Sequence, residues 1–219
     1  MAQQRPGRPP LPTDRIIDTA IRIVDEEGAA ALTFRSLAGR LSSSTATLYR
    51  HVANRTELLN LVFDRMIGEA ALDGDDLARL PWDEVCRLSA SKLYAVLSRH
   101  GGAAALLADV VPSGRNALAA RELLLDVLLR AGFDPLVAVR TVATLVHYVL
   151  GFSMQTPTAQ TAAQDTGLTL TEIDPELFPQ TAAHALYLPI PILEEFEFGL
   201  ELLISGLHAQ LPLSRVPLQ

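Results

Sequence analysis

Cysteine is nearly absent from this sequence: Cys86 is the single one, so the chain cannot close an internal disulfide. A lone cysteine is typical of proteins from a reducing compartment, and we therefore expect a cytoplasmic location. Cys86 itself is expected to pack as a small residue on an amphipathic helix. The first dozen residues, MAQQRPGRPPLP, also have no apolar run of the kind that a secretory signal requires.

Long apolar runs free of polar groups are missing as well. The most apolar stretch, residues 136–154, contains Arg140 and His147. Polar groups at these positions favour a buried core helix over a membrane span, so we expect no membrane partner. No segment shows a convincing alternation of apolar and polar residues, which argues against a β fold.

Catalytic signatures are also missing. The sequence has no GxSxG, no P-loop, no HExxH and no paired cysteine and histidine spacing for a metal. Glu194, Glu195 and Glu197 stand at helical spacing and are expected to form a solvated face. The histidines at 100, 147, 184 and 208 are scattered along the chain. We therefore expect no enzymatic activity, no cofactor and no metal site, and keep a helical enzyme as one alternative function.

Positive charge is scarce overall, with 18 Lys and Arg against 25 Asp and Glu, a net charge of −7. Its distribution is uneven, however. Residues 1–55 hold eight Arg and five acids, a balance of +3, whereas the remaining chain holds ten basic and twenty acidic residues, a balance of −10. This pattern is expected when one small module binds the phosphates of nucleic acid and the rest of the chain does not.

What the sequence does contain is helical periodicity, punctuated by Gly and Pro. A first helix is expected to start near Thr13, which can cap it, and to stop before Gly28. Thr33 can cap a second helix, and Ser42 to Ser44 are the turn and cap residues of a short third helix through His51. Further helices are expected at about 56–72, 81–100, 115–131, 135–155 and 191–210. The stretch 156–190 looks loop-like, with one short helix after Pro175. Residues 73–76 break the pattern and mark the expected domain boundary.

The most informative segment runs from Leu32 to His51 and reads LTFRSLAGRLSSSTATLYRH. It describes two short helices joined by a tight turn. The second helix starts with small and polar residues, which lets it enter the major groove of DNA close to the base edges. Tyr49, His51 and Arg55 are placed to reach phosphates. The residues expected to contact DNA are Arg35, Ser44, Thr45, Ala46, Thr47, Tyr49, Arg50, His51 and Arg55.

Two further features bear on DNA binding. Arg5 and Arg8 lie in a proline-rich arm that cannot be helical, and such arms can lie in a minor groove. A non-specific structural DNA-binding protein is a second alternative. The acidic body and the large apolar second half argue against it, because phosphate binding alone requires neither.

The segment Leu32 to His51 resembles the helix-turn-helix of the TetR family. Thr33, the pair Leu37–Ala38 and the run Thr47–His51 carry the resemblance. The second half is similar to the tetracycline repressor subgroup of that family. The similar segments are Pro81–Trp82, 131–133, 146–151 and the last helix from Phe196 to Leu211. The resemblance covers nearly the whole chain past Thr13.

This resemblance implies an all-α fold: an N-terminal three-helix helix-turn-helix DNA-binding domain and a larger C-terminal helical ligand-binding and dimerisation domain. The expected parts are a flexible basic arm at 1–12, the DNA-binding domain at 13–55, a linking helix at 56–72, the C-terminal domain at 73–211 and a tail at 212–219. Such a homodimer represses transcription from a palindromic operator in double-stranded DNA and is released by a small-molecule effector.

The resemblance also assigns roles to single residues. Arg35 is expected to read a guanine, and Leu61 and Met66 are expected to couple effector binding to DNA release through the linking helix. The last helix, Ile192 to Leu207, is expected to have no partner within its own domain and to pack in the dimer. Gly199 and Gly206 would allow its close approach to another helix.

The expected lining of the effector pocket is likewise implied by the resemblance. It consists of Ala71, Ser89, Leu93, Leu107, Val110, Val111, Pro112, Leu124, Val142, Val146 and Gln155. In the tetracycline repressor subgroup, a histidine and a glutamate hold the magnesium of the drug complex, and Leu107 and Gln155 fall at those positions. Neither supplies the ligand atom or charge that the metal needs. We therefore expect a mostly apolar organic effector. Arg121 could supply one charge near the rim, although a surface role is favoured.

Overall fold

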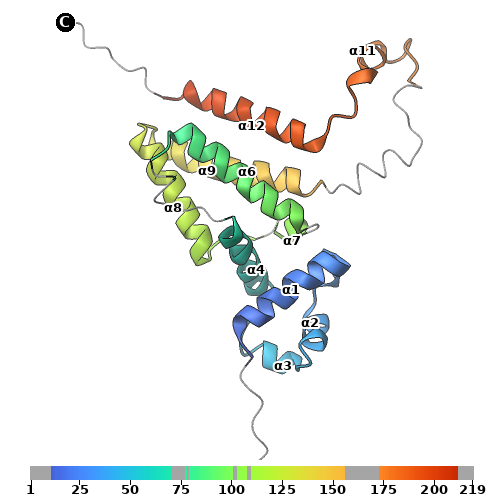
Figure 1. Cartoon of the computed structure of the whole chain (residues 1–219), viewed down its shortest axis with the longest axis vertical. Helices are drawn as coiled ribbons and strands as arrows, with labels where there is room; N and C mark the ends of the chain where they lie inside the picture. Colours follow the sequence, from blue (N-terminus) through green and yellow to red (C-terminus); the bar gives the residue numbers. More distant parts are fainter. Residues whose placement is uncertain are drawn as a thin grey trace, which may run out of the picture.

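The computed structural model describes residues 11–70, 77, 79–100, 103–107 (the Leu107 side chain excepted), 110–155 and 173–211. Every regular element among these residues is a helix, which confirms the expected all-α fold. Figure 1 shows a small group of helices at one end and a larger group at the other, with the helix α4 between them. Residues 1–10 of the predicted arm, the predicted boundary at 73–76 and the tail 212–219 lie outside the described residues.

The small group contains α1 (Thr13–Glu27), the 3-10 turn η1 (Ala29–Ala31), α2 (Phe34–Arg40) and α3 (Thr45–Leu48). Its core closes over Leu37 and Leu48, which are fully buried as the sequence pattern predicts. Gly28, at φ 84°, ends α1 in a left-handed conformation that glycine adopts without steric cost. Thr13 is the first helical residue rather than the cap, because Pro12 occupies the cap position and its fixed φ suits a helix start.

The helix α4 (Arg55–Glu69) joins the two groups. The side chain of Asn54 caps it by accepting from the Glu57 N–H at 2.9 Å, and the Glu57 carboxylate accepts from the Ala53 N–H at 2.6 Å. Reciprocal bonds of this kind satisfy donors that a helix start otherwise leaves unpaired. α4 packs against α1 on one side and against α6 and α8 on the other.

The larger group is a helical bundle with a separate arm. Its elements are α6 (Trp82–Arg99), α7 (Ala103–Leu107), α8 (Arg115–Arg130), α9 (Pro135–Ser153), α11 (Pro179–Ala183), η3 (Ala185–Tyr187) and α12 (Ile192–His208). α6 and α9 form its centre, while α11 and η3 stand away from the bundle in Figure 1. α9 is long and apolar enough to span a membrane by length and composition alone, and in this fold it packs between α6 and α8.

The last helix, α12, corrects one expectation. Its side chains Phe196, Leu200 and Ile204 are buried within the same subunit, and the ring of Phe196 stacks on Tyr94 at 4.2 Å. The helix therefore does have a partner in its own domain, because its apolar residues form two faces rather than one. On the opposite face, Phe198 is 66% exposed and Leu202 is 59% exposed.

The two glycines of α12 differ in their surroundings. A Cβ at Gly199 would lie 2.3 Å from the hydroxyl oxygen of Tyr148, which itself donates to the Phe196 carbonyl at 2.6 Å. Gly199 therefore makes room for a side chain of its own subunit. A Cβ at Gly206 would meet nothing within 4 Å, so this position is open at the surface.

Candidate functional site

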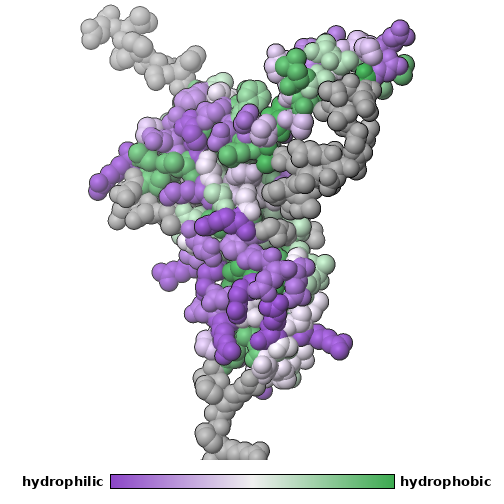
Figure 2. Space-filling view, turned by 45° about the vertical axis from the view of Figure 1, so that its right-hand side comes forward, coloured by the Kyte–Doolittle hydropathy of each residue, from purple (hydrophilic) through white to green (hydrophobic). Residues whose placement is uncertain are grey.

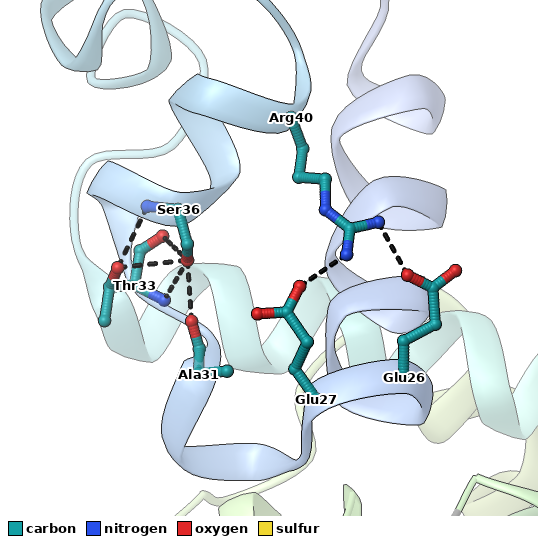
Figure 3. A network of polar contacts seen from close by, with 6 residues as sticks. All are labelled: Glu26, Glu27, Ala31, Thr33, Ser36 and Arg40. Carbon is teal, nitrogen blue, oxygen red and sulfur yellow. Dashed lines mark hydrogen bonds and ion pairs between the residues drawn. The ribbon is translucent and has the colours of Figure 1, made fainter.

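The start of α2 is fixed by a dense set of polar contacts, drawn in Figure 3. The Thr33 hydroxyl accepts from the Ser36 N–H at 3.0 Å, and the Ser36 hydroxyl accepts from the Thr33 N–H at 3.0 Å. Arg40 at the other end of α2 pairs with Glu26 at 2.6 Å and also with Glu27, both at the end of α1. These contacts confirm the predicted Thr33 cap and hold α2, which carries the exposed Arg35, in a set orientation on α1.

The short helix α3 presents the predicted contact face. Ser44 caps it by accepting from the Thr47 N–H at 3.1 Å, and Leu48 anchors it in the core at 0% exposure. Ser42, at φ 48°, makes the turn between α2 and α3. Thr45 and Ala46 are exposed at the N-terminal end of α3. Small side chains at this end leave a surface that fits close to base edges in a major groove.

Tyr49 lies just beyond α3 and is 54% exposed. Its ring is stacked on that of Phe34, with centroids 4.5 Å apart and planes 6° apart. Sequence reasoning missed Phe34, because no local pattern links two aromatic residues fifteen positions apart. The stack restricts the orientation of Tyr49, the residue predicted to reach a phosphate.

The basic residues after α3 are arranged differently from one another. Arg50 is exposed and donates to the Thr47 hydroxyl at 3.2 Å, whereas His51 is half-buried. Arg55 donates to the carbonyl of Leu32 at 2.6 Å, and therefore braces the start of α2 from α4. Both guanidinium groups therefore bond within the protein, but only the Arg55 contact joins α4 to the start of α2.

A cavity of about 540 Å³ lies in the larger group of helices. Eight residues predicted for the effector pocket line it: Ser89, Leu93, Val110, Val111, Pro112, Leu124, Val142 and Val146. Ala71 and the side chain of Leu107 lie outside the described residues. Gln155 is exposed beyond the end of α9 and is not part of the lining, because α9 ends at Ser153 before it could point into the cavity.

The cavity has two further walls that sequence reasoning missed. Phe63, Ile67 and Ala70 of α4 line it directly. His147 also lines it from α9. Arg121 of α8, which was expected near the rim, lines the cavity as well. The signal for His147 was present in its helical spacing, since Val139, Ala143 and His147 are separated by one turn each and so share a face. The linking helix is therefore itself part of the cavity wall.

Three polar side chains stand out in this apolar lining. Ser89 is 6% exposed, and its hydroxyl oxygen has no hydrogen-bond partner among the described residues. Arg121 is half-buried and donates to the Pro112 carbonyl at 3.3 Å. His147 is exposed at the open side of the cavity. A buried hydroxyl without a partner is costly, which marks Ser89 as a group that a bound molecule would satisfy.

Asp64 joins α4 to α8, a helix of the cavity wall. One carboxylate oxygen of Asp64 accepts from the Ala117 N–H at 2.9 Å, and the other accepts from the Asn116 side chain at 3.2 Å. Both donors lie in the first turn of α8, where unpaired N–H groups and the helix dipole favour a negative charge. On the opposite side, Arg65 pairs with Asp14 and, at 2.7 Å, with Asp18 of α1.

A second polar junction joins the two groups of helices. His100, which follows the end of α6, lies between the carboxylates of Asp25 in α1 and Glu69 in α4, at 3.1 and 3.2 Å. The three residues come from distant parts of the sequence, and none was predicted to interact. α6 also supplies Ser89 and Leu93 to the cavity, so this junction connects a cavity wall to the small group.

Cys86 behaves as predicted. It is fully buried in α6, and burial, assisted by the charge of Asp83, raises the pKa of its thiol to about 12. A thiol with such a pKa is protonated at neutral pH and unreactive as a nucleophile.

Comparison with known proteins places both halves of the chain. Residues 16–62 match the family described as bacterial regulatory proteins, tetR family, and residues 76–211 match the tetracyclin repressor-like C-terminal domain. An HTH-type transcriptional regulator of Saccharopolyspora erythraea is 32% identical over 68% of this chain, which spans 62% of that relative's length. The HTH-type transcriptional repressor DrrR1 of Streptomyces coeruleorubidus is 28% identical over 94% of this chain and 81% of its own.

The fold is also similar to that of a solved structure. The structure of apo ActR from Streptomyces coelicolor superposes with a TM-score of 0.81 at 31% identity, covering 93% of this chain and 98% of ActR. ActR has also been solved in complex with (S)-DNPA and with actinorhodin.

Proposed function

This chain belongs to the TetR family of bacterial regulatory proteins, and we propose that it binds a palindromic operator as a homodimer and leaves it when a mostly apolar organic molecule enters the cavity. The protein is a ligand-responsive transcriptional repressor and not an enzyme. Neither alternative kept above, a helical enzyme or a non-specific structural DNA-binding protein, has support among the relatives.

The observation that carries the proposal is the position of α4. Its side chains Phe63 and Ile67 line the cavity, while Arg65 on another face pairs with α1 of the helix-turn-helix unit. A molecule that displaces the cavity wall therefore acts directly on an element that holds the DNA-binding helices. We propose a matching division into domains. Residues 13–55 contact DNA, residues 56–72 link the two domains, and residues 73–211 bind the effector and the partner subunit.

For DNA, we assign base reading to Arg35 and to the N-terminal end of α3. Arg35 is exposed, and no carboxylate pairs with it among the described residues, so its guanidinium is available for a guanine edge. Thr45, Ala46 and Thr47 meet bases and the nearby backbone, whereas Tyr49 and Arg50 hold phosphates. Arg55 is assigned a bracing role in addition to a phosphate contact, since it already bonds the Leu32 carbonyl.

For the dimer, the support comes from apolar surface that the single subunit leaves uncovered. Phe198 and Leu202 form an exposed stripe on α12 that continues to Gly206 at one-turn spacing. In Figure 2, hydrophilic residues dominate the narrow helix-turn-helix end of this face, while hydrophobic residues gather toward the opposite end of the molecule. A symmetric dimer across α9 and α12 would place two recognition helices one DNA turn apart, roughly 34–36 Å.

A mobility shift with DNA taken from beside the gene, at two salt concentrations, tests the function. We expect the protein to bind one DNA sequence tightly and to keep that binding at the higher salt concentration. At least one member of a library of apolar organic compounds should release the protein from this DNA. Binding that falls equally for all sequences, or that no compound relieves, would contradict the proposal.

A further inference from the structure

Charge in the cavity wall indicates the chemical class of the effector. Arg121 is the only Asp, Glu, Lys or Arg among the described lining residues, and most of the others are Val, Leu, Ala, Ile or Phe. A cavity of this composition encloses apolar rings or chains readily, but it gives a bound molecule one fixed positive charge to satisfy.

Arg121 is poorly satisfied by the protein itself. Its guanidinium group has five N–H donors, and the one bond that the structure gives it is the 3.3 Å contact with the Pro112 carbonyl. Arg40, Arg65 and Arg87 each pair with a carboxylate, whereas no carboxylate within the described chain lies at ion-pair distance from Arg121. A half-buried cation beside an apolar space loses part of its hydration, and an anion next to it compensates that loss.

Ser89 gives a second, independent indication. Its hydroxyl is buried in the lining, on α6 and not on the helix of Arg121, and has no partner within the described chain. A ligand that contacts both groups needs an acidic group for Arg121 and a separate carbonyl or hydroxyl for Ser89. A cationic ligand would meet repulsion from Arg121 and no acidic side chain within the described lining.

We infer that the natural effector is an organic acid: an apolar, ring-bearing molecule whose carboxylate or acidic phenol pairs with Arg121 and whose second oxygen bonds Ser89. This inference rests on the proposed function, because it takes the cavity as the effector site. It adds the charge of the ligand and the side chain that selects it. Charge-assisted bonds between a guanidinium and a carboxylate are strong and directional, so Arg121 acts as a specificity-determining residue.

Matched probes test the inference. Anthraquinone-2-carboxylate and anthraquinone-2-carboxamide share shape and differ in charge, and pyrene-1-carboxylate with its carboxamide forms a second pair. Calorimetry on the full-length protein should give at least about tenfold tighter binding of an acid than of its amide. Arg121→Gln should remove that advantage and leave amide binding unchanged, which also shows that the variant is folded. Arg115→Gln, on the same helix but outside the lining, is the matched charge control and should retain the advantage.

The outcomes separate the inference from the function on which it rests. If no acid binds more tightly than its amide, or if the advantage survives in Arg121→Gln, the inference is overturned. Operator release by the neutral partners at equal concentration would then leave the proposed function standing. If the protein binds no operator selectively, or no compound of any charge releases it, the proposed function fails instead.

Discussion

The bond between Asp64 and the start of α8 is predicted to carry effector coupling. Asp64 belongs to the linking helix, and its two hydrogen-bond donors, Asn116 and Ala117, begin α8. One turn further along α8, Ala120 and Arg121 line the cavity. Removal of the carboxylate in Asp64→Ala loses the 2.9 Å bond from the Ala117 N–H and the 3.2 Å bond from the Asn116 side chain, while Asn116 keeps its 3.0 Å bond to the Asp64 carbonyl. One hydrogen bond to a charged group contributes about 1.5–3 kcal/mol.

The expected effect concerns the coupling between ligand and DNA. Coupling free energies between two sites are typically about 1–3 kcal/mol, so the loss of about 2 kcal/mol removes most of it. The measured quantity is the ratio of the operator Kd at saturating effector to the operator Kd without effector. We expect this ratio to fall about tenfold or more in Asp64→Ala, while the operator Kd without effector changes by less than about threefold.

Two further variants make the test specific. A Cβ at Gly114 would lie 2.2 Å from the Asp64 carboxyl carbon, so Gly114→Ala should displace the carboxylate and reproduce the loss of coupling. Asp126→Ala removes an exposed i,i+4 ion pair with Arg130 on the same helix and should leave the ratio unchanged. A lower melting temperature of Asp64→Ala with an unchanged ratio would refute the reasoning, since Asp64 would then serve stability alone. Met66→Gly is a poorer probe, because Met66 is fully buried and its loss destabilises the core.

Four other predictions follow from the site and the surface. In a binding assay with operator variants, Arg35→Ala should reduce the discrimination between bases at one operator position by about 1–3 kcal/mol, whereas Tyr49→Phe should lower the affinity for all variants about equally. The same uniform loss of affinity in both would contradict the division of roles. Leu202→Glu should give a monomer in sedimentation at micromolar concentration, and Leu129→Glu, an exposed position on α8, should not; a stable wild-type monomer would refute the dimer. Cys86 should resist thiol reagents until the protein unfolds, and labelling of the native protein at neutral pH would contradict this. Because the folded pKa of its thiol, about 12, exceeds the ordinary value near 9, the contribution of Cys86 to stability should be complete below about pH 9. In alkaline melts this contribution should be lost as the pH rises toward 12. Calorimetry with tetracycline should show no magnesium-dependent binding, and submicromolar affinity that requires magnesium would overturn the expectation drawn from Leu107 and Gln155.

The elements that could be predicted from the sequence are those that local chemistry determines. Thr33 and Ser44 are capping residues whose side chains act within three positions, and Leu37 and Leu48 are buried by helical spacing alone. The two short helices η1 and α7 were not predicted, since three to five residues are too few to show a helical period. Eight of the residues that line the cavity were expected through resemblance, which transfers positions but not side-chain partners.

The contacts that join the two halves could not be predicted, and the reason is physical. Asp64 and Ala117 are 53 positions apart, and Asp25 and Glu69 meet His100 from separate helices. Helical periodicity reports whether a residue faces inward, but not which polar group it will meet there. We propose that these contacts transmit the signal between the cavity and the DNA-binding unit, and they are the part of the molecule that depends most on the folded structure.

The packing of the final helix, α12, could not be predicted from its sequence either. The sequence led us to expect that α12 has no partner within its own domain, because helical periodicity does not distinguish packing on the subunit's own core from packing on a partner subunit. The structure divides the apolar residues of α12: Phe196, Leu200 and Ile204 pack against the subunit's own core, and Phe198 and Leu202 remain exposed. Exposed aromatic and aliphatic side chains on one stripe are unfavourable in a monomer, which supports the proposed dimer as the source of the second layer. Gly206 continues that stripe with open space above its Cα, which is where a second helix can approach most closely.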